Sequence, residues 1–138
     1  MMTPSSISLH ASDAEVNAAV AQHCAGWKPD PYSGHLVPPE YTPHEGFYAT
    51  AKVPPYSTSA DAVLSLLEQR PNDLWSHDVH RALEHEPDGY YRYVAWNGVR
   101  DGRILSGHHR ARMTVLFART AAFTLLKAHG VKVVEDQV

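Results

Sequence analysis

The chain has 138 residues, a length typical of one domain, and its 43% hydrophobic and 20% charged residues match ordinary globular proteins. The formal net charge of −3 argues against general nucleic-acid binding, because affinity for a phosphate backbone requires a basic surface. No apolar run approaches the roughly 18 residues that span a bilayer, and the first ten residues lack a secretory signal's basic and apolar regions, so we expect a single intracellular domain over residues 1–138.

The N-terminal part of the chain predicts a tail followed by a helix. Residues 1–11 are polar and are expected to be flexible. Ser12 is a suitable helix N-cap, and Glu15, three positions later, completes a capping box. Gly26 is expected to end this helix, because glycine tolerates the left-handed conformation common at helix ends.

Residues 28–56 contain seven of the ten prolines of the chain. Proline lacks a backbone N–H and fixes φ, so this proline-rich segment is expected to be a loop with one short edge strand in GFYATAKV, residues 46–53. Loops of this length are often binding loops or covers over a site.

The segment YSTSADAVLSLLEQRP, residues 56–71, predicts the clearest helix of the chain. Thr58 or Ser57 is expected to cap it, apolar residues recur at helical spacing, and Pro71 ends it.

The next segments predict a meander of three antiparallel strands. LWSHDVHRALEHE alternates loosely, PDG supplies a turn, and YYRYVAW is rich in aromatic and β-branched residues. Asn97-Gly98 is the strongest short hairpin signal, so VRDGRIL is expected to be the return strand.

The last helix is expected to run from Gly107 to His129 and to end at Gly130. Apolar residues fill more than half of its circumference, which favours burial against sheet and helices or a second copy of the chain, and hence a homo-oligomer. Thr120, Thr124 and Lys127 form a narrow polar strip, with Arg112 and Arg119 beside it. The elements together predict an α+β fold: a small antiparallel sheet of three to four strands, a meander, packed with about three helices.

The order of these elements resembles the phage ABA sandwich domain family, small phage proteins that mostly have no defined activity. The resemblance lies in Gly26-Trp27, in Tyr56 to Gln69 and in Ala118-Arg119 with the alanines that follow. It differs at the start of the last helix, where GHHRARMTVL replaces a proline-containing segment. The resemblance implies a layered α+β fold and a phage origin, hence the host cell cytoplasm, and it transfers no catalytic residue.

Ten histidines raise the alternative of a metal-dependent histidine enzyme, since imidazole is the commonest metal ligand. His77 and His80 would point to opposite faces of a strand, however, and no metal-binding motif is present. Cys24 is the single cysteine, which excludes an intramolecular disulfide and a thiolate metal site. No nucleophile stands beside a base at a recognisable spacing. We therefore predict no enzyme activity, no metal and no cofactor.

Five of the eight arginines fall within residues 100–119. A glycine before a helix start leaves backbone N–H groups free and places the positive end of the helix dipole there, which favours an anion. The predicted ligand-binding residues are those that would hold phosphate, donate hydrogen bonds or stack on a ring: Arg103, His108, His109, Arg110, Arg112, Arg119, Tyr91, Tyr93 and Trp96.

Two functions follow from this pattern. The first is a non-enzymatic phage protein of counter-defence. It would bind a small phosphate-bearing, nucleotide-like immune signal and sequester it, as a molecular sponge does. The alternative is a protein-binding inhibitor of a host defence factor without a small ligand, since aromatic residues and arginine are favoured at interaction hot spots.

Overall fold

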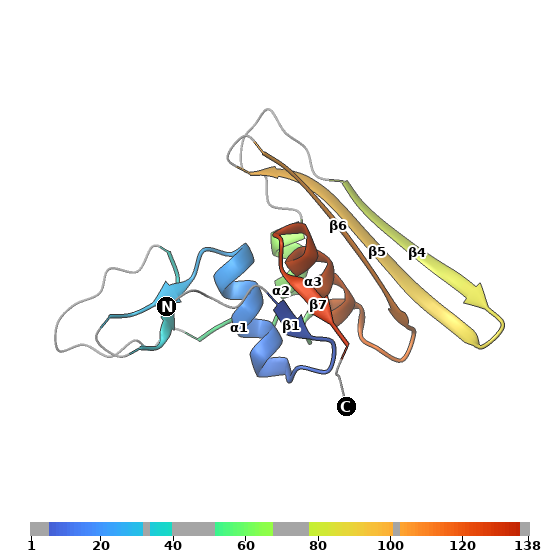
Figure 1. Cartoon of the computed structure of the whole chain (residues 1–138), viewed down its shortest axis with the longest axis horizontal. Helices are drawn as coiled ribbons and strands as arrows, with labels where there is room; N and C mark the ends of the chain where they lie inside the picture. Colours follow the sequence, from blue (N-terminus) through green and yellow to red (C-terminus); the bar gives the residue numbers. More distant parts are fainter. Residues whose placement is uncertain (1–5, 32–33, 40–51, 68–77, 101–102, 136–138) are drawn as a thin grey trace.

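The computed structural model describes residues 6–31, 34–39, 52–67, 78–100 and 103–135. Within this part of the chain it has three helices, a three-stranded antiparallel sheet and two small two-stranded sheets, so the predicted α+β class is confirmed. Helix α3 (Phe117–Ala128) lies at the centre: the long sheet covers one side, and α1 (Asp13–Cys24) and α2 (Ala60–Leu67) pack on others, as Figure 1 shows. None of the described helices has the length and apolar character needed to cross a membrane.

The three-stranded sheet consists of β4 (Asp78–Glu86), β5 (Gly89–Arg100) and β6 (Arg103–Arg112) in the order β4-β5-β6. The predicted meander is therefore confirmed, with Pro87-Asp88 between the first two strands. The hairpin predicted at Asn97-Gly98 is wrong, because β5 continues to Arg100, which pairs with Arg103. Gly98 has a packing role instead: a Cβ there would lie 2.5 Å from the indole ring of Trp96.

The predicted start of the last helix at Gly107 is also wrong. Residues Arg103–Arg112 form β6, and α3 begins only at Phe117 after the N-cap Leu116. Gly107 lies within the strand opposite Trp96, where a Cβ would come within 2.6 Å of the Thr124 carbonyl oxygen and the Ala128 nitrogen. The glycine thus allows strand and helix backbones to approach closely.

Helix α1 forms as predicted. Ser12 Oγ accepts a hydrogen bond from the Glu15 N–H at 3.2 Å, and the Glu15 carboxylate accepts one from the Ser12 N–H, so both halves of the capping box are present. Gly26 follows the helix with φ +78°.

Part of the N-terminal segment that was predicted to be flexible is ordered. Strand β1 (Ser6–Ser8) pairs in parallel with β7 (Lys132–Val134), and Ala11 is buried in the core. The parallel pairing joins residues from the two ends of the described chain. Such a long-range contact cannot be predicted from a local sequence pattern.

Helix α2 is capped by Ser59, whereas Thr58 or Ser57 was expected. Ser59 Oγ accepts a hydrogen bond from the Ala62 N–H at 3.2 Å. Ser57 is buried and instead donates from its hydroxyl to the Asp13 carboxylate at 3.0 Å, which ties α2 to α1. The expected end of the helix at Pro71 lies outside the described residues.

The proline-rich segment contains a small antiparallel pair, β2 (Lys28–Pro29) with β3 (Leu36–Val37). The edge strand expected in residues 46–53 falls almost wholly outside the described residues. Trp27, just before this pair, is half-buried and packs against the core.

Nine of the twelve residues of α3 are buried, including both threonines of the predicted polar strip. Thr124 donates from its hydroxyl to the Val94 carbonyl at 3.0 Å, which satisfies a polar group in the interior. Because α1, α2 and the strands cover this helix within one chain, its apolar circumference no longer argues for a second copy.

A groove along the free edge of strand β6

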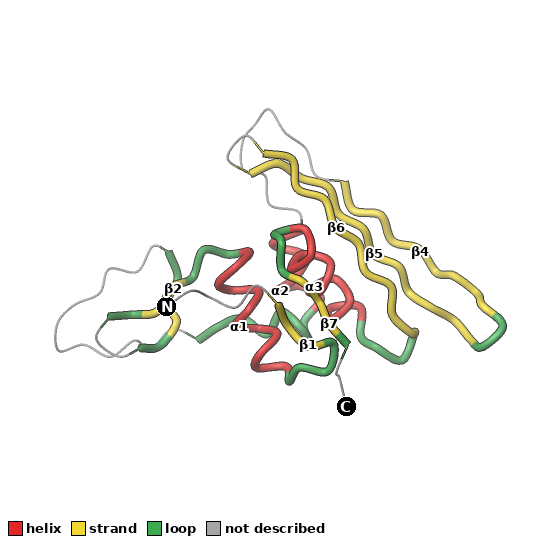
Figure 2. Tube along the Cα trace, in the orientation of Figure 1, coloured by secondary structure: helices red, strands yellow, loops and turns green. Residues whose placement is uncertain are grey.

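Strand β6 is an edge of the three-stranded sheet, and within the described part of the chain no further strand pairs with it (Figure 2). A groove beside this edge is lined by residues of β6, of α3 and of both ends of the described chain. It consists of two pockets, of about 580 and 280 Å³, that share four lining residues: Leu9, His109, Arg110 and Glu135. The larger pocket, here called the arginine compartment, also contacts Arg112, Arg119 and Tyr91. The smaller pocket, here called the lysine compartment, also contacts His108 and Lys127.

His109 lies where the two compartments meet. Its side chain is only 6% exposed, its ring tilts against that of Phe123 at 5.1 Å between centroids, and its Nδ1 has no hydrogen-bond partner in the described structure. Burial lowers the pKa of His109 to about 4, with smaller contributions from the charges of Lys127, His108 and Arg119. The imidazole is therefore neutral at pH 7, and His109, which lines both compartments, carries a buried polar nitrogen that is unsatisfied in the described structure.

Three of the four predicted arginines, Arg110, Arg112 and Arg119, line this groove, and each already has a carboxylate partner. Arg110 contacts Glu86 at 2.7 Å and Glu84 at 3.6 Å, and Arg112 contacts Asp88 at 2.7 Å. These carboxylates come from β4 and from the turn after it, which the meander places on the other side of β5 from β6, so the arginines reach them across β5. The positive charges of Arg110 and Arg112 are thus compensated within the chain.

Arg119 has a structural role that the sequence did not indicate. Its guanidinium contacts Asp13 at 3.2 Å and donates to the carbonyl oxygens of Leu9 and Ala11. It lines the groove, but its hydrogen bonds hold the N-terminal segment against α3.

The aromatic residues predicted to stack on a ligand have different roles. The prediction that Trp96 stacks on a ligand is wrong. Trp96 is 4% exposed in the core, donates from Nε1 to the Leu67 carbonyl at 2.8 Å and stacks on His129, so it cannot contact a ligand in the groove. Tyr93 stacks on His108 at 5.7 Å on the sheet face and does not line the groove.

Tyr91 lines the arginine compartment, but its ring is already covered. The Arg110 guanidinium lies 3.9 Å from the ring centroid, and the Tyr91 hydroxyl donates to Asp88 at 2.7 Å. This hydrogen bond raises the pKa of Tyr91 and, with Arg112, lowers the pKa of Asp88.

Arg103 begins β6 at the end opposite the groove, and its side chain is outside the described structure. The prediction that residues 107–112 begin a helix whose N-terminus binds an anion is therefore wrong, because these residues form a strand and α3 begins at Phe117. Five predicted residues still line the larger compartment: His109, Arg110, Arg112, Arg119 and Tyr91.

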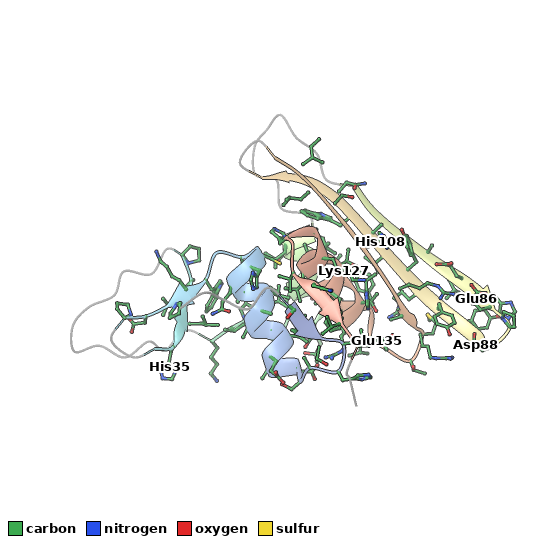
Figure 3. The ribbon with its side chains drawn as sticks, viewed as in Figure 1. His35, Glu86, Asp88, His108, Lys127 and Glu135 are labelled. Carbon is green, nitrogen blue, oxygen red and sulfur yellow. The ribbon has the colours of Figure 1, made fainter. Side chains whose placement is uncertain are left out.

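Sequence reasoning missed Lys127 and Glu135 as site residues. Lys127 projects from α3 toward the lysine compartment, near His108 on β6 (Figure 3). Burial lowers the pKa of Lys127, and among the described residues no carboxylate lies within 4 Å of it. A lysine in the last turn of an almost fully apolar helix was the available signal, but only the fold brings Glu135 beside it.

No three histidine, cysteine, aspartate or glutamate side chains in the described ranges gather as metal ligands, and His77 lies outside those ranges. In the three comparisons with known proteins, no family model, no curated protein and no solved structure matched the chain. The resemblance to the phage ABA sandwich domain family therefore stays a prediction from the sequence.

Proposed function

We propose that this chain is a non-enzymatic binding protein that captures a small, phosphate-bearing, nucleotide-like ligand in the β6 groove. The observation that carries this proposal is His109, which lines both compartments of the groove and whose buried Nδ1 has no partner in the described structure. Leaving such a group unsatisfied costs about 1–3 kcal/mol, so a ligand that hydrogen-bonds to it regains that free energy.

The dimensions and the lining support a small ligand. The arginine compartment, at about 580 Å³, has the volume of common small-molecule sites, which measure roughly 300–1,000 Å³. Val115, Ala111 and Phe123 supply apolar contact area, and His109 with the guanidinium groups supplies a small number of polar contacts. Such a lining suits a planar ring joined to a polar, charged group.

The proposed setting follows the resemblance described above: a phage protein in the host cytoplasm that lowers the free concentration of a nucleotide immune signal. A sponge of this kind needs binding without turnover.

His109 itself supplies the test. The protein is mixed with 3′,5′-cyclic and linear nucleotides, and binding is followed by thermal shift, by analysis of ligand released on denaturation and by NMR titration of His109. We expect one nucleotide class to raise the melting temperature and to move the pKa of His109 upward from about 4, because an anion nearby stabilises the imidazolium.

The variant H109F removes the unpaired nitrogen, and H85F, on an exposed histidine of β4 outside the groove, is the matched control. Binding should fall at least tenfold in H109F and stay unchanged in H85F. If no nucleotide gives either a thermal shift or a His109 response, the proposal is rejected.

The alternative, a protein-binding inhibitor, is favoured by a different observation. Ile104 is 81% exposed and Leu83 is 61% exposed on the long sheet, where isolated apolar side chains project into solvent. Capture of a host defence protein that I104D or L83D abolishes, while H109F leaves it intact, would support this function over the first.

A further inference from the structure

We infer that the lysine compartment is a phosphate subsite built on Lys127, and that Glu135 across it accepts hydrogen bonds from the hydroxyls of the attached sugar. This inference rests on the proposed function, because it states how a nucleotide would be oriented in the same groove. It differs from the sequence prediction, which assigned the phosphate to the arginines.

The first step is the difference in charge compensation between the two compartments. Arg110, Arg112 and Arg119 each contact a carboxylate at 2.7 to 3.2 Å, so a phosphate there must displace or share an existing partner. Lys127 has no such contact within the described structure, and its ammonium group is the cation available to a ligand without a competing ion pair.

The second step concerns burial. Lys127 extends from a helix that is otherwise packed into the core, and part of its side chain is removed from water. A desolvated ammonium group gains more from a nearby anion than one in bulk water, because the attraction is less screened. The groups that surround the same space are His108, His109 and Arg110, all of which can donate a hydrogen bond.

The third step is the single acidic residue. Glu135 lines both compartments and has no ion pair in the described part of the chain. A carboxylate repels a second phosphate but accepts hydrogen bonds from hydroxyl groups, as acidic residues do toward ribose in dinucleotide-binding sites. The pair Lys127 and Glu135 therefore favours one phosphate next to a sugar with free hydroxyls, that is, a ribonucleoside monophosphate unit.

The fourth step is the path of the ligand. Leu9, His109, Arg110 and Glu135 line both pockets, so the two compartments adjoin. A phosphate at Lys127 and a sugar near Glu135 leave the base to enter the arginine compartment, against Val115 and Phe123. His109, which lines both compartments, then lies beside the middle of the ligand.

The experiment measures affinities by calorimetry for three probes: adenosine 5′-monophosphate, its 2′,3′-dideoxy analogue and adenosine, with the guanosine, cytidine and uridine series in parallel. K127Q should weaken binding of the monophosphate about tenfold or more and leave the affinity for the nucleoside unchanged. E135Q should weaken binding of the ribonucleotide and spare the dideoxy analogue. K132Q and D61N, on exposed residues outside the groove, are the matched controls and should bind as the parent does.

The outcomes separate this inference from the proposed function. If a nucleotide binds and H109F abolishes binding, but K127Q binds with unchanged affinity, the phosphate subsite is wrong while the proposed function stands. If R112Q, rather than K127Q, selectively weakens the monophosphate, the phosphate lies in the arginine compartment and the inference is overturned. If no nucleotide binds to the parent protein, both fail. Circular dichroism of every variant excludes loss of fold as the cause.

Discussion

At the scale of single residues, the side chains along β6 show that burial gives two residues of the same type different chemical properties. His108 and His109 are neighbours, yet His108 is exposed on the sheet face and His109 is buried against Phe123. Alternation along a strand sends successive side chains to opposite faces. One histidine therefore stays in solvent, whereas the other carries an unsatisfied buried nitrogen.

Replacing His109 should raise stability while abolishing function. H109F removes the unpaired Nδ1 and keeps a ring against Phe123, so we expect the free energy of unfolding to rise by about 1 kcal/mol. Chemical denaturation measures it, with H109L as a second variant in case the larger ring does not fit. A loss of more than about 1 kcal/mol in both variants would mean that Nδ1 is satisfied in the folded protein.

The same residue predicts a pH dependence. The folded pKa of about 4 lies below the usual value of 6.5, so the unfolded state binds more protons between these values, and stability falls as pH decreases from 6.5 to 4. A difference of that size corresponds to about 3 kcal/mol. Denaturation at pH 7 and pH 4 should show this loss for the parent protein relative to H109F. Equal losses in both proteins would assign the acid sensitivity to other groups.

At the scale of elements, close contact between β6 and α3 determines where the helix begins. Leu105, Gly107 and His109 are buried, while Ser106, His108 and Arg110 between them are exposed, which is a strand period of two. A glycine and a histidine occupy two of the three buried positions, so the apolar side of the strand was not evident in the sequence. The run of alanines after Phe117 was evident, and the predicted helix was extended backward into the strand.

Gly107→Ala tests this contact. The added Cβ would meet backbone atoms of α3 at 2.6 Å, and backbone cannot move aside as a flexible side chain can, so we expect a loss of about 2–3 kcal/mol. Ser106→Ala, at the exposed position just before it, is the control: it removes only an exposed hydrogen bond to Asn97 and should change stability by less than about 1 kcal/mol. An unchanged denaturation midpoint for G107A would show that the helix does not approach the strand so closely.

At the scale of the whole molecule, long-range contacts join the ends of the chain to the centre. Strands β1 and β7 pair in parallel, and Arg119 on α3 holds the carbonyl oxygens of Leu9 and Ala11. The groove exists because this N-terminal segment and Glu135 lie opposite β6.

Arg119→Met should loosen this arrangement. It leaves two partly buried carbonyl groups without their donor and removes one of the two donors to Asp13, the other being the Ser57 hydroxyl, and we expect a loss of about 2 kcal/mol. Hydrogen exchange should increase first in Ser6–Ser8 and Lys132–Val134. R112M breaks an ion pair that lies in solvent and should leave the unfolding midpoint nearly unchanged. If both variants behave alike, Arg119 does not hold the N-terminal segment.

Local chemistry explains the features that the sequence predicted correctly. The capping box of α1, the turn after β4, the aromatic strand β5 and the alanine-rich core of α3 each depend on residues a few positions apart. These features can be predicted from the sequence because the residues that interact to form them are close together in the chain. The clustering of arginines near His109 was also visible, and five of the predicted residues do line one compartment.

Tertiary structure alone decided which of those charges are available to a ligand. The charges of Arg110 and Arg112 are compensated by carboxylates of β4 and of the turn after it. These carboxylates are within reach only because the meander places β4 next to β5, on the side away from β6. Trp96 became core, and Lys127 and Glu135 came to face one space, through contacts between residues far apart in the chain. A sequence states the sign of each charge, but whether that charge is already paired depends on distances that only the folded chain sets.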